Sequence, residues 1–173
     1  MDIDRPSERV LSLREISAET VREICELAVG PHQQGLVAPN AVSIAEAYFE
    51  PAAWFRAVYA GETPLGFAML FDPTRAREPE RDDTCFLWRF MIDHRHQRRG
   101  YGAEALRLLV AQACTLPGVT RFKTSFVDKP GNASPLYLRA GFHLTGEIDD
   151  GEIVLELPLG PVAPDQCPGS VMR

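Results

Sequence analysis

The sequence predicts a single α/β (α+β) domain in which helices flank a sheet. Two observations lead to this class. Short apolar runs rich in β-branched and aromatic residues recur along the chain, and between them lie segments whose apolar residues follow a helical period. The length of 173 residues is sufficient for a buried core, and a composition of 45% hydrophobic and 24% charged residues is typical of globular proteins. We expect residues 1–157 to form the domain and the proline-rich residues 158–173 to form a C-terminal tail.

The elements follow from periodicity and from turn residues. In chain order we expect a strand over 10–15, helices over 18–29 and 44–49, strands over 54–60, 65–71 and 86–92, a helix after Gly102, a strand over 120–127, a short helix that ends at Gly141, and strands over 142–146 and 152–157. Ser17 is a good N-cap for the first helix, and Ser43 with Glu46 has the spacing of a capping box for the second. The turn sequences at 61–64 and 149–151 each predict a hairpin.

The stretch from Phe86 to Val110 contains the clearest functional signal. An apolar strand pattern ends at Ile92, a basic segment with Gly100 and Gly102 follows, and a helical pattern begins there. Backbone N–H groups in the first turn of a helix lack intrahelical partners, and the helix dipole adds positive charge at that end. Glycines let a ligand approach the backbone, so strand, glycine turn and helix N-terminus together predict a binding site for a diphosphate.

Charge and cysteine content exclude several classes of function. The net charge of −6 disfavours nucleic-acid binding, so the basic segment at 94–99 suits a small anion, and the acidic remainder suits a cationic second ligand. No apolar run is long enough to span a membrane, and the first residues lack a signal-peptide core, so we expect a cytoplasmic protein that binds no membrane. The four cysteines are scattered without a Cys-x-x-Cys pair, which predicts neither a metal site nor a disulfide framework.

Two motifs carry a resemblance to a known family. Gln97-x-x-Gly100-x-Gly102 follows one predicted strand, and Leu136-Tyr137-x-x-x-Gly141-Phe142 follows the next. This combination resembles the GNAT superfamily of acetyl-CoA-dependent N-acetyltransferases. The resemblance covers about residues 10–157 and implies a GNAT-type fold, in which a mixed, mostly antiparallel sheet is splayed at its central strands and flanked by helices. It also implies that homodimers are common.

The resemblance assigns acetyl-CoA as the co-substrate, with no metal. Backbone N–H groups of the glycine turn would hold the pyrophosphate, and the pantetheine arm would pair with the free edge of the 86–92 strand. Tyr137 would be the catalytic residue that protonates or hydrogen-bonds the departing sulfur. The residues implied to bind the cofactor are Phe90, Met91, Ile92, Gln97, Arg98, Arg99, Gly100, Tyr101, Gly102, Ala103, Asn132 and Tyr137.

A narrower resemblance concerns the acceptor, a small-molecule amine. Residues 37–40, 43–48 and 87–93 are similar to diamine and spermine/spermidine acetyltransferases. It implies a polyamine acceptor bound near Asn40, Glu46, Glu50 and Trp88, with the acidic 72–83 loop adding negative charge. The alternatives are transfer to another amine, such as an antibiotic, an amino acid or a protein N-terminus, and a non-catalytic acetyl-CoA-binding module.

The general base stays open among several groups. The candidates are Glu46, Glu50, Asp93, His94, or a water molecule held by backbone carbonyls. Because strand neighbours point to opposite faces, we expect one of Trp88 and Arg89 to face the site and the other to face away, with Trp88 on the same face as Phe90 and Ile92.

Overall fold

A computed structural model of the chain describes residues 10–77 and 82–160. Seven strands form one sheet in the order β1-β2-β3-β4-β5-β7-β6, and every neighbouring pair is antiparallel except β4 and β5, which are parallel. The elements are β1 (Leu11–Arg14), α1 (Val21–Glu26), η2 (Pro31–Gln33), α2 (Asn40–Ala47), β2 (Ala53–Ala60), β3 (Thr63–Phe71), β4 (Thr84–Ile92), η3 (His94–His96), α3 (Tyr101–Cys114), β5 (Arg121–Phe126), α4 (Ser134–Arg139), β6 (His143–Asp149) and β7 (Glu152–Pro158). The predicted mixed, mostly antiparallel sheet is confirmed.

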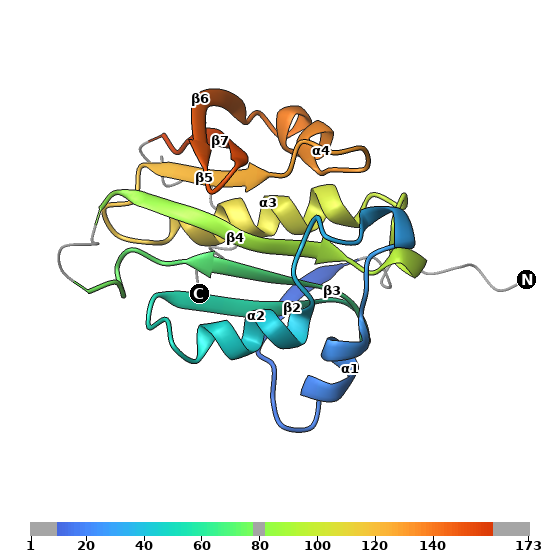
Figure 1. Ribbon diagram of the computed structural model, residues 1–173. Helices are drawn as coiled ribbons and strands as arrows, with labels where there is room; N and C mark the ends of the chain where they lie inside the picture. Colours follow the sequence, from blue (N-terminus) through green and yellow to red (C-terminus); the bar gives the residue numbers. More distant parts are fainter. Residues whose placement is uncertain (1–9, 78–81, 161–173) are drawn as a thin grey trace, which may run out of the picture.

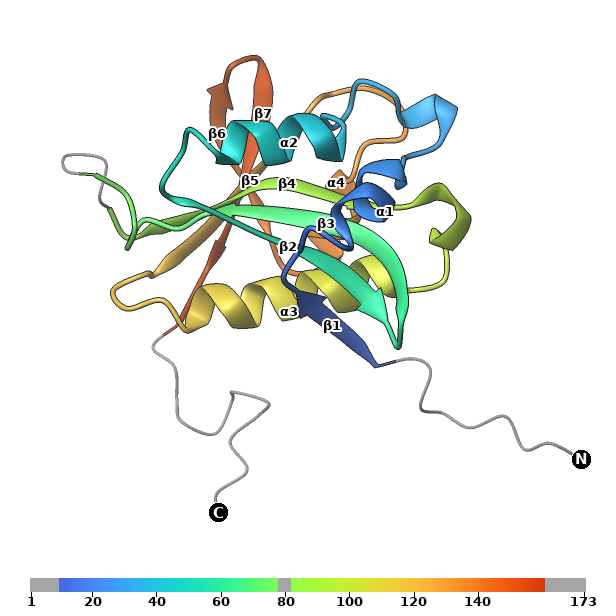
Figure 2. The same cartoon turned by 90° about the horizontal axis from the view of Figure 1, so that it is seen from below.

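Helices cover both faces of this sheet, and each face has its own core. Figures 1 and 2 show α1 and α2 on one face and α3 on the other. On the α3 face, Leu106 and Leu109 pack with Phe122 and with Tyr137 from α4. On the α1 face, Ile24 packs with residues of β2, β3 and β4, including Met91. Strand β4 therefore lies between two cores and is held firmly in place.

The sheet is splayed between β4 and β5. These strands pair only where Thr84–Leu87 meets Arg121–Thr124, and the described pairing on that side of β4 ends there. Strand β4 continues to Ile92, so its last residues present a backbone edge that β5 does not cover. The splay implied by the family resemblance is confirmed, and it opens the space in which the site lies.

A β-bulge at Trp88 overturns the expected alternation along β4. Arg89 pairs with Met69 and Leu87 pairs with Leu70, so Trp88 is an extra residue without a partner in the β3–β4 register. Trp88 consequently packs in the core on the α1 face, whereas Phe90 and Ile92 pack on the α3 face. The prediction that Trp88 shares a face with those two residues is wrong, because a bulge shifts the side-chain parity of a strand.

The helix starts also differ from the predicted ones. Helix α1 begins at Val21, because residues 18–20 form a turn, and α2 begins at Asn40 directly after Pro39. Ser43 is buried inside α2 and its hydroxyl donates to the Pro39 carbonyl, so the predicted capping box is wrong. The earlier start has a tertiary cause: the buried Asn40 side chain donates to the Ile24 carbonyl at 2.8 Å.

The last strand extends one residue beyond its predicted end at residue 157. Pro158 belongs to β7, and the Leu159 amide donates to the Thr120 carbonyl at 2.8 Å. The rest of the predicted tail, residues 161–173, lies outside the described residues. Strand β6 is longer than expected and reaches Asp149, so the closing hairpin has a tight tip.

Asp93 joins the end of β4 to the segment that follows α1. Its fully buried carboxylate accepts hydrogen bonds from the Ala28 amide at 3.0 Å and from the Arg95 amide and guanidinium. Burial alone would raise the pKa of this carboxyl group, but the hydrogen bonds from Arg95 and Ala28 outweigh it and lower the pKa to about 2. Asp93 therefore holds the turn after β4 against the other wall of the site.

We expect Asp93→Asn to destabilise the fold by about 2.5 kcal/mol at neutral pH, the value that the lowered pKa implies. A depressed pKa stabilises the folded state above the unfolded-state pKa, near 3.9, and this contribution disappears as the pH falls toward 2. Urea unfolding at pH 7 and near pH 2.5 measures the difference, which should shrink at the lower pH.

The matched control is Asp128→Asn, which removes an exposed carboxylate and should change stability by less than about 0.5 kcal/mol. Equal stability of wild type and Asp93→Asn at pH 7 would contradict the role of this residue.

Candidate active site

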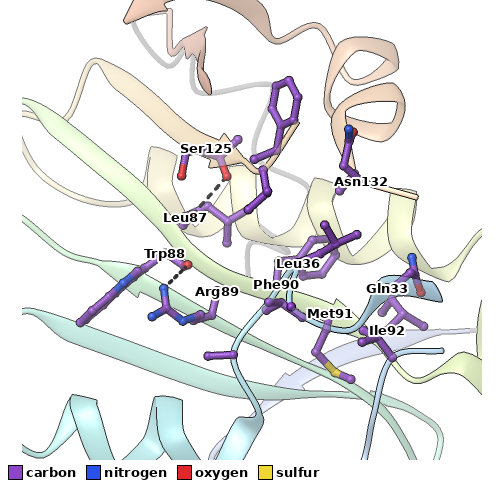
Figure 3. A pocket seen from close by; sticks show the side chains of 18 of the residues that line it. Gln33, Leu36, Leu87, Trp88, Arg89, Phe90, Met91, Ile92, Ser125 and Asn132 are labelled. Carbon is purple, nitrogen blue, oxygen red and sulfur yellow. Dashed lines mark hydrogen bonds between the residues drawn. The ribbon is translucent and has the colours of Figure 1, made fainter. Parts of the chain in front are cut away.

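A groove of about 1080 Å³ follows the splay between β4 and β5. One wall comes from residues 33–40, which lead into α2 and include its first residue. The opposite wall comes from residues 131–133 and α4. Its floor is the second half of β4, and its ends are the turn at 97–102 and the β6–β7 hairpin. Figure 3 shows Gln33 and Ile92 near one end and Ser125 on the far side of β4 from Arg89.

The turn before α3 has the geometry of an anion site. Arg98 and Gly100 both adopt left-handed conformations, with φ of 62° and 88°, and Gly100 is the N-cap of the 14-residue helix α3. No side chain caps the amides of this helix terminus, so they stay available to a ligand. A left-handed arginine is a strained conformation of the kind that accumulates at ligand clamps. The groups that this turn offers to an anion are therefore backbone amides.

The side chain of Gln97 braces the turn from inside the groove. Its amide group donates to the Ile92 carbonyl at 2.9 Å and to the Gln33 side chain at 2.8 Å. Gln33 in turn donates to the Gly131 carbonyl at 3.2 Å. This chain of hydrogen bonds crosses from the α1 side of the groove to the α4 side. Gln97 thus positions the cradle and the strand edge rather than presenting its side chain to an anion.

The edge of β4 combines buried side chains with an uncovered backbone. Phe90 and Met91 pack on opposite faces of the sheet, and Ile92 is 8% exposed. All three line the groove. Such an edge can receive an extended amide-bearing ligand in the manner of an added strand, as predicted for these residues.

Tyr137 lines the groove and is 4% exposed. Burial raises the pKa of its hydroxyl to about 12, although a hydrogen bond with Thr124 acts in the opposite direction. Thr124 also donates to the Leu87 carbonyl at 3.2 Å, at the last paired residue of β4. Tyr137 is therefore protonated at working pH and can act as a proton donor, not as a base.

The four predicted acceptor residues do not share one location. Trp88 and Asn40 line the groove, but the Asn40 amide is already bonded to Ile24. Glu46 and Glu50 are not among the described residues that line it. Glu46 binds Arg89 at 3.0 Å, and Glu50 accepts from the Ala52 amide, so each has a structural partner.

Other predicted residues have local partners as well. The Asn132 amide donates to the Lys129 carbonyl and its oxygen accepts from the Ser134 amide, so this side chain stabilises the turn before α4. Asp93 is buried and ion-paired with Arg95, which makes it unsuitable as a general base. His94 lies 3.0 Å from the Ala28 carbonyl and is not among the described groove residues. Of the predicted bases, a water molecule held by backbone groups remains.

The acidic groups of the groove come from a place that sequence reasoning missed. Asp149, Asp150 and Glu152, at the β6–β7 hairpin, all line it. The sequence shows only a hairpin turn here. The residues reach the groove because β7 lies beside β5, and this order of strands is a tertiary feature.

Two further properties concern the part of the chain that the structure describes. No helix there combines the length and apolar character that a membrane span requires. Nor do three His, Cys, Asp or Glu side chains gather there closely enough to hold a metal ion.

Comparison with known proteins agrees with this geometry. A model of the family described as "Acetyltransferase (GNAT) family" matches residues 21–142. The spermine/spermidine N(1)-acetyltransferase of Bacillus subtilis is 27% identical over 150 residues, which cover 84% of this chain and 96% of that protein. An acetyltransferase from Thermus thermophilus has the same fold with a TM-score of 0.66 at 20% identity, covering 88% of this chain and 99% of the other. An aminoglycoside acetyltransferase solved with coenzyme A and kanamycin gives a TM-score of 0.69 at 18% identity, covering 86% and 95%.

We expect Gly100→Ala and Gly102→Ala to affect coenzyme A binding differently. Alanine at Gly100 must adopt φ of 88°, which costs about 1–2 kcal/mol and displaces the amides of the turn. Alanine at Gly102 sits in the helix with ordinary contacts of 3.6 Å to Leu136 and 3.9 Å to Ile92. Gly100→Ala should raise the Kd of acetyl-CoA at least about tenfold, a loss of about 1.4 kcal/mol.

Gly102→Ala is the control and should change that Kd less than about threefold while keeping or raising the melting temperature. Titration calorimetry and thermal unfolding measure both effects. An unchanged Kd in Gly100→Ala would contradict a pyrophosphate site at this turn.

Proposed function

Because this chain belongs to the acetyltransferase (GNAT) family and is an acetyl-CoA-dependent N-acetyltransferase, we propose that its acceptor is a polyamine such as spermidine or spermine. The observation that carries the proposal is the charge of the groove. Asp149, Asp150 and Glu152 line the end away from the glycine turn, and Arg89, which also lines the groove, is paired with Glu46 at 3.0 Å. An acidic end of this kind favours an acceptor with several positive charges.

The division of the groove supports direct transfer in a ternary complex. Acetyl-CoA supplies an acyl group on a thioester. The backbone amides from Arg98 to Ala103, including those of Arg99 and Tyr101, would hold its diphosphate. The strand edge from Phe90 to Ile92 would align the arm that carries the thioester. The acceptor would then approach from the hairpin end, so both reactants meet near Tyr137.

Proton movement in this arrangement has a defined balance. An alkylammonium group has a pKa near that of lysine, about 10.4, so it must lose one proton to water before its nitrogen can attack. The nitrogen–carbon bond forms as the carbon–sulfur bond breaks. Tyr137 would give its hydroxyl proton to the departing sulfur and recover one from the acylated nitrogen, so one proton is released overall. A backbone N–H near Ile92 would stabilise the carbonyl oxygen.

Relatives favour a polyamine over other amines. The Bacillus subtilis protein that shares 27% identity over most of both chains is a spermine/spermidine N(1)-acetyltransferase. The second candidate is an aminoglycoside, because a solved neighbour binds kanamycin and because an aminoglycoside is also a polycation. A neutral peptide N-terminus would make less use of the three carboxylates at the hairpin.

A thiol-release assay over an acceptor panel tests the polyamine assignment. We expect kcat/KM for spermidine and spermine to exceed those for kanamycin and for an uncharged peptide by at least about tenfold, a difference of about 1.4 kcal/mol. Salt should lower the polyamine values most, since exposed charge pairs are screened. Background rates with every polyamine would contradict the assignment, and a preference for kanamycin would favour the second candidate.

Replacing the proposed proton donor should separate chemistry from binding. Tyr137→Phe keeps the buried ring contact with Phe142, whose centroid lies 5.6 Å away, and removes only the hydroxyl. We expect kcat to fall about 10²-fold or more with little change in the Kd of acetyl-CoA.

Tyr48→Phe removes a hydroxyl from an exposed tyrosine that does not line the groove and serves as the control; it should leave kcat nearly unchanged. An unchanged kcat in Tyr137→Phe would remove the catalytic role and would favour a non-catalytic acetyl-CoA-binding module if wild type is also inactive.

A further inference from the structure

We propose that Glu152, held by Ser125, binds the non-reacting ammonium group of the acceptor and so determines the preference for diamines over monoamines. This assignment rests on the proposed polyamine function and adds to it a single residue with a defined task.

The position of Glu152 is fixed from two sides. It opens β7 and pairs with Asp149 across the hairpin, while the next residue, Ile153, pairs with Phe126 of β5. The Ser125 hydroxyl donates to a Glu152 carboxylate oxygen at 2.5 Å. The side chain is half-buried and lines the groove. A carboxylate with this support can hold a ligand in one orientation.

The charge of Glu152 is not neutralised by the protein. In the described part of the chain, no cation lies within ion-pair distance of it, and its hydrogen-bond partner is the uncharged Ser125 hydroxyl. The contrast is with Glu147 on the same hairpin, which binds Lys123 at 2.9 Å, and with Glu46, which binds Arg89. A half-buried carboxylate without a counter-ion favours a cationic ligand.

Glu152 also lies close enough to the reaction centre to act on it electrostatically. Burial is the main cause of the raised pKa of Tyr137, and the negative charge of Glu152 contributes to it. The carboxylate therefore lies within electrostatic range of the hydroxyl, although the two belong to different elements, β7 and α4.

The chemistry decides which nitrogen Glu152 should bind. A carboxylate beside the attacking nitrogen would keep that nitrogen protonated and slow the reaction, because an opposite charge stabilises the charged form. A second ammonium, separated from the first by three or four methylene groups, has the opposite requirement, since it stays charged throughout. Glu152 suits this second group and would leave the reacting nitrogen free to lose its proton near Tyr137.

The test compares putrescine with n-butylamine, which has the same carbon chain and lacks the second amino group. Glu152→Gln keeps an acceptor for the Ser125 hydroxyl and removes the charge. We expect kcat/KM for putrescine to fall about tenfold or more, mainly through KM, since the variant loses a charge-assisted hydrogen bond to the ammonium group. The value for n-butylamine should change less than about twofold.

Glu147→Gln removes the same charge from the same hairpin, outside the groove, and should change neither substrate's kinetics. Unchanged melting temperature and acetyl-CoA affinity in Glu152→Gln would show that the fold and cofactor site are intact. An equal loss with both amines, a loss confined to kcat, or no loss at all would overturn the assignment while leaving a polyamine acceptor standing. If wild type does not prefer putrescine to n-butylamine, the assignment falls, and the panel of acceptors decides whether the polyamine function falls with it.

Discussion

The site depends on one incomplete strand pairing. Strands β4 and β5 are hydrogen-bonded over four register pairs and then diverge, although both continue toward the same end of the sheet. Backbone N–H and C=O groups without hydrogen-bond partners destabilise a sheet. Where β4 and β5 diverge, such groups of β4 can bond to a ligand that carries amide groups. Thr124 marks the end of the pairing, because its buried hydroxyl bonds the Leu87 carbonyl on one strand and Tyr137 on the helix above. The open edge and the proposed proton donor are therefore connected through one side chain.

The two ends of the groove offer different chemical groups to a ligand. At the glycine turn, the groups available to a ligand are main-chain amides. The hydrogen bonds of the Gln97 and Asp93 side chains fix the segment that carries them. At the hairpin end, Asp149, Asp150 and Glu152 line the groove, so the groups available there are side-chain carboxylates. A backbone site tolerates sequence change as long as the turn keeps its conformation, whereas a side-chain site changes its preference with one substitution. This difference allows one fold to serve relatives that act on acceptors as unlike as spermidine and kanamycin.

Local signals in the sequence predicted the turn and helix start where we propose that the cofactor binds. The conformation of this turn depends on neighbouring residues, and Gly100 and α3 both lie where the pattern indicated. The acceptor half was not predictable in the same way. The bulge at Trp88 inserts a residue that only the partner strand reveals, and it turns Trp88 and Arg89 toward the same face. From the sequence, Glu46 is a plausible residue for binding the acceptor amine. In the folded chain its carboxylate forms an ion pair with Arg89, which is distant from it in sequence.

Pairing within the protein explains how an acidic groove can contain an arginine. An unpaired guanidinium beside the splay would repel a polycation. Arg89 instead lies beside α2, where Glu46 neutralises it, and its guanidinium stacks 5.1 Å from the ring of Trp88, which the bulge places on the same face. The positive charge of Arg89 is thus neutralised within the protein. The carboxylates of the β6–β7 hairpin therefore make the electrostatic potential negative at that end of the groove. The proposed polarity of the site, with an anion at the helix terminus and a cation at the hairpin, follows from which charged groups have partners within the protein.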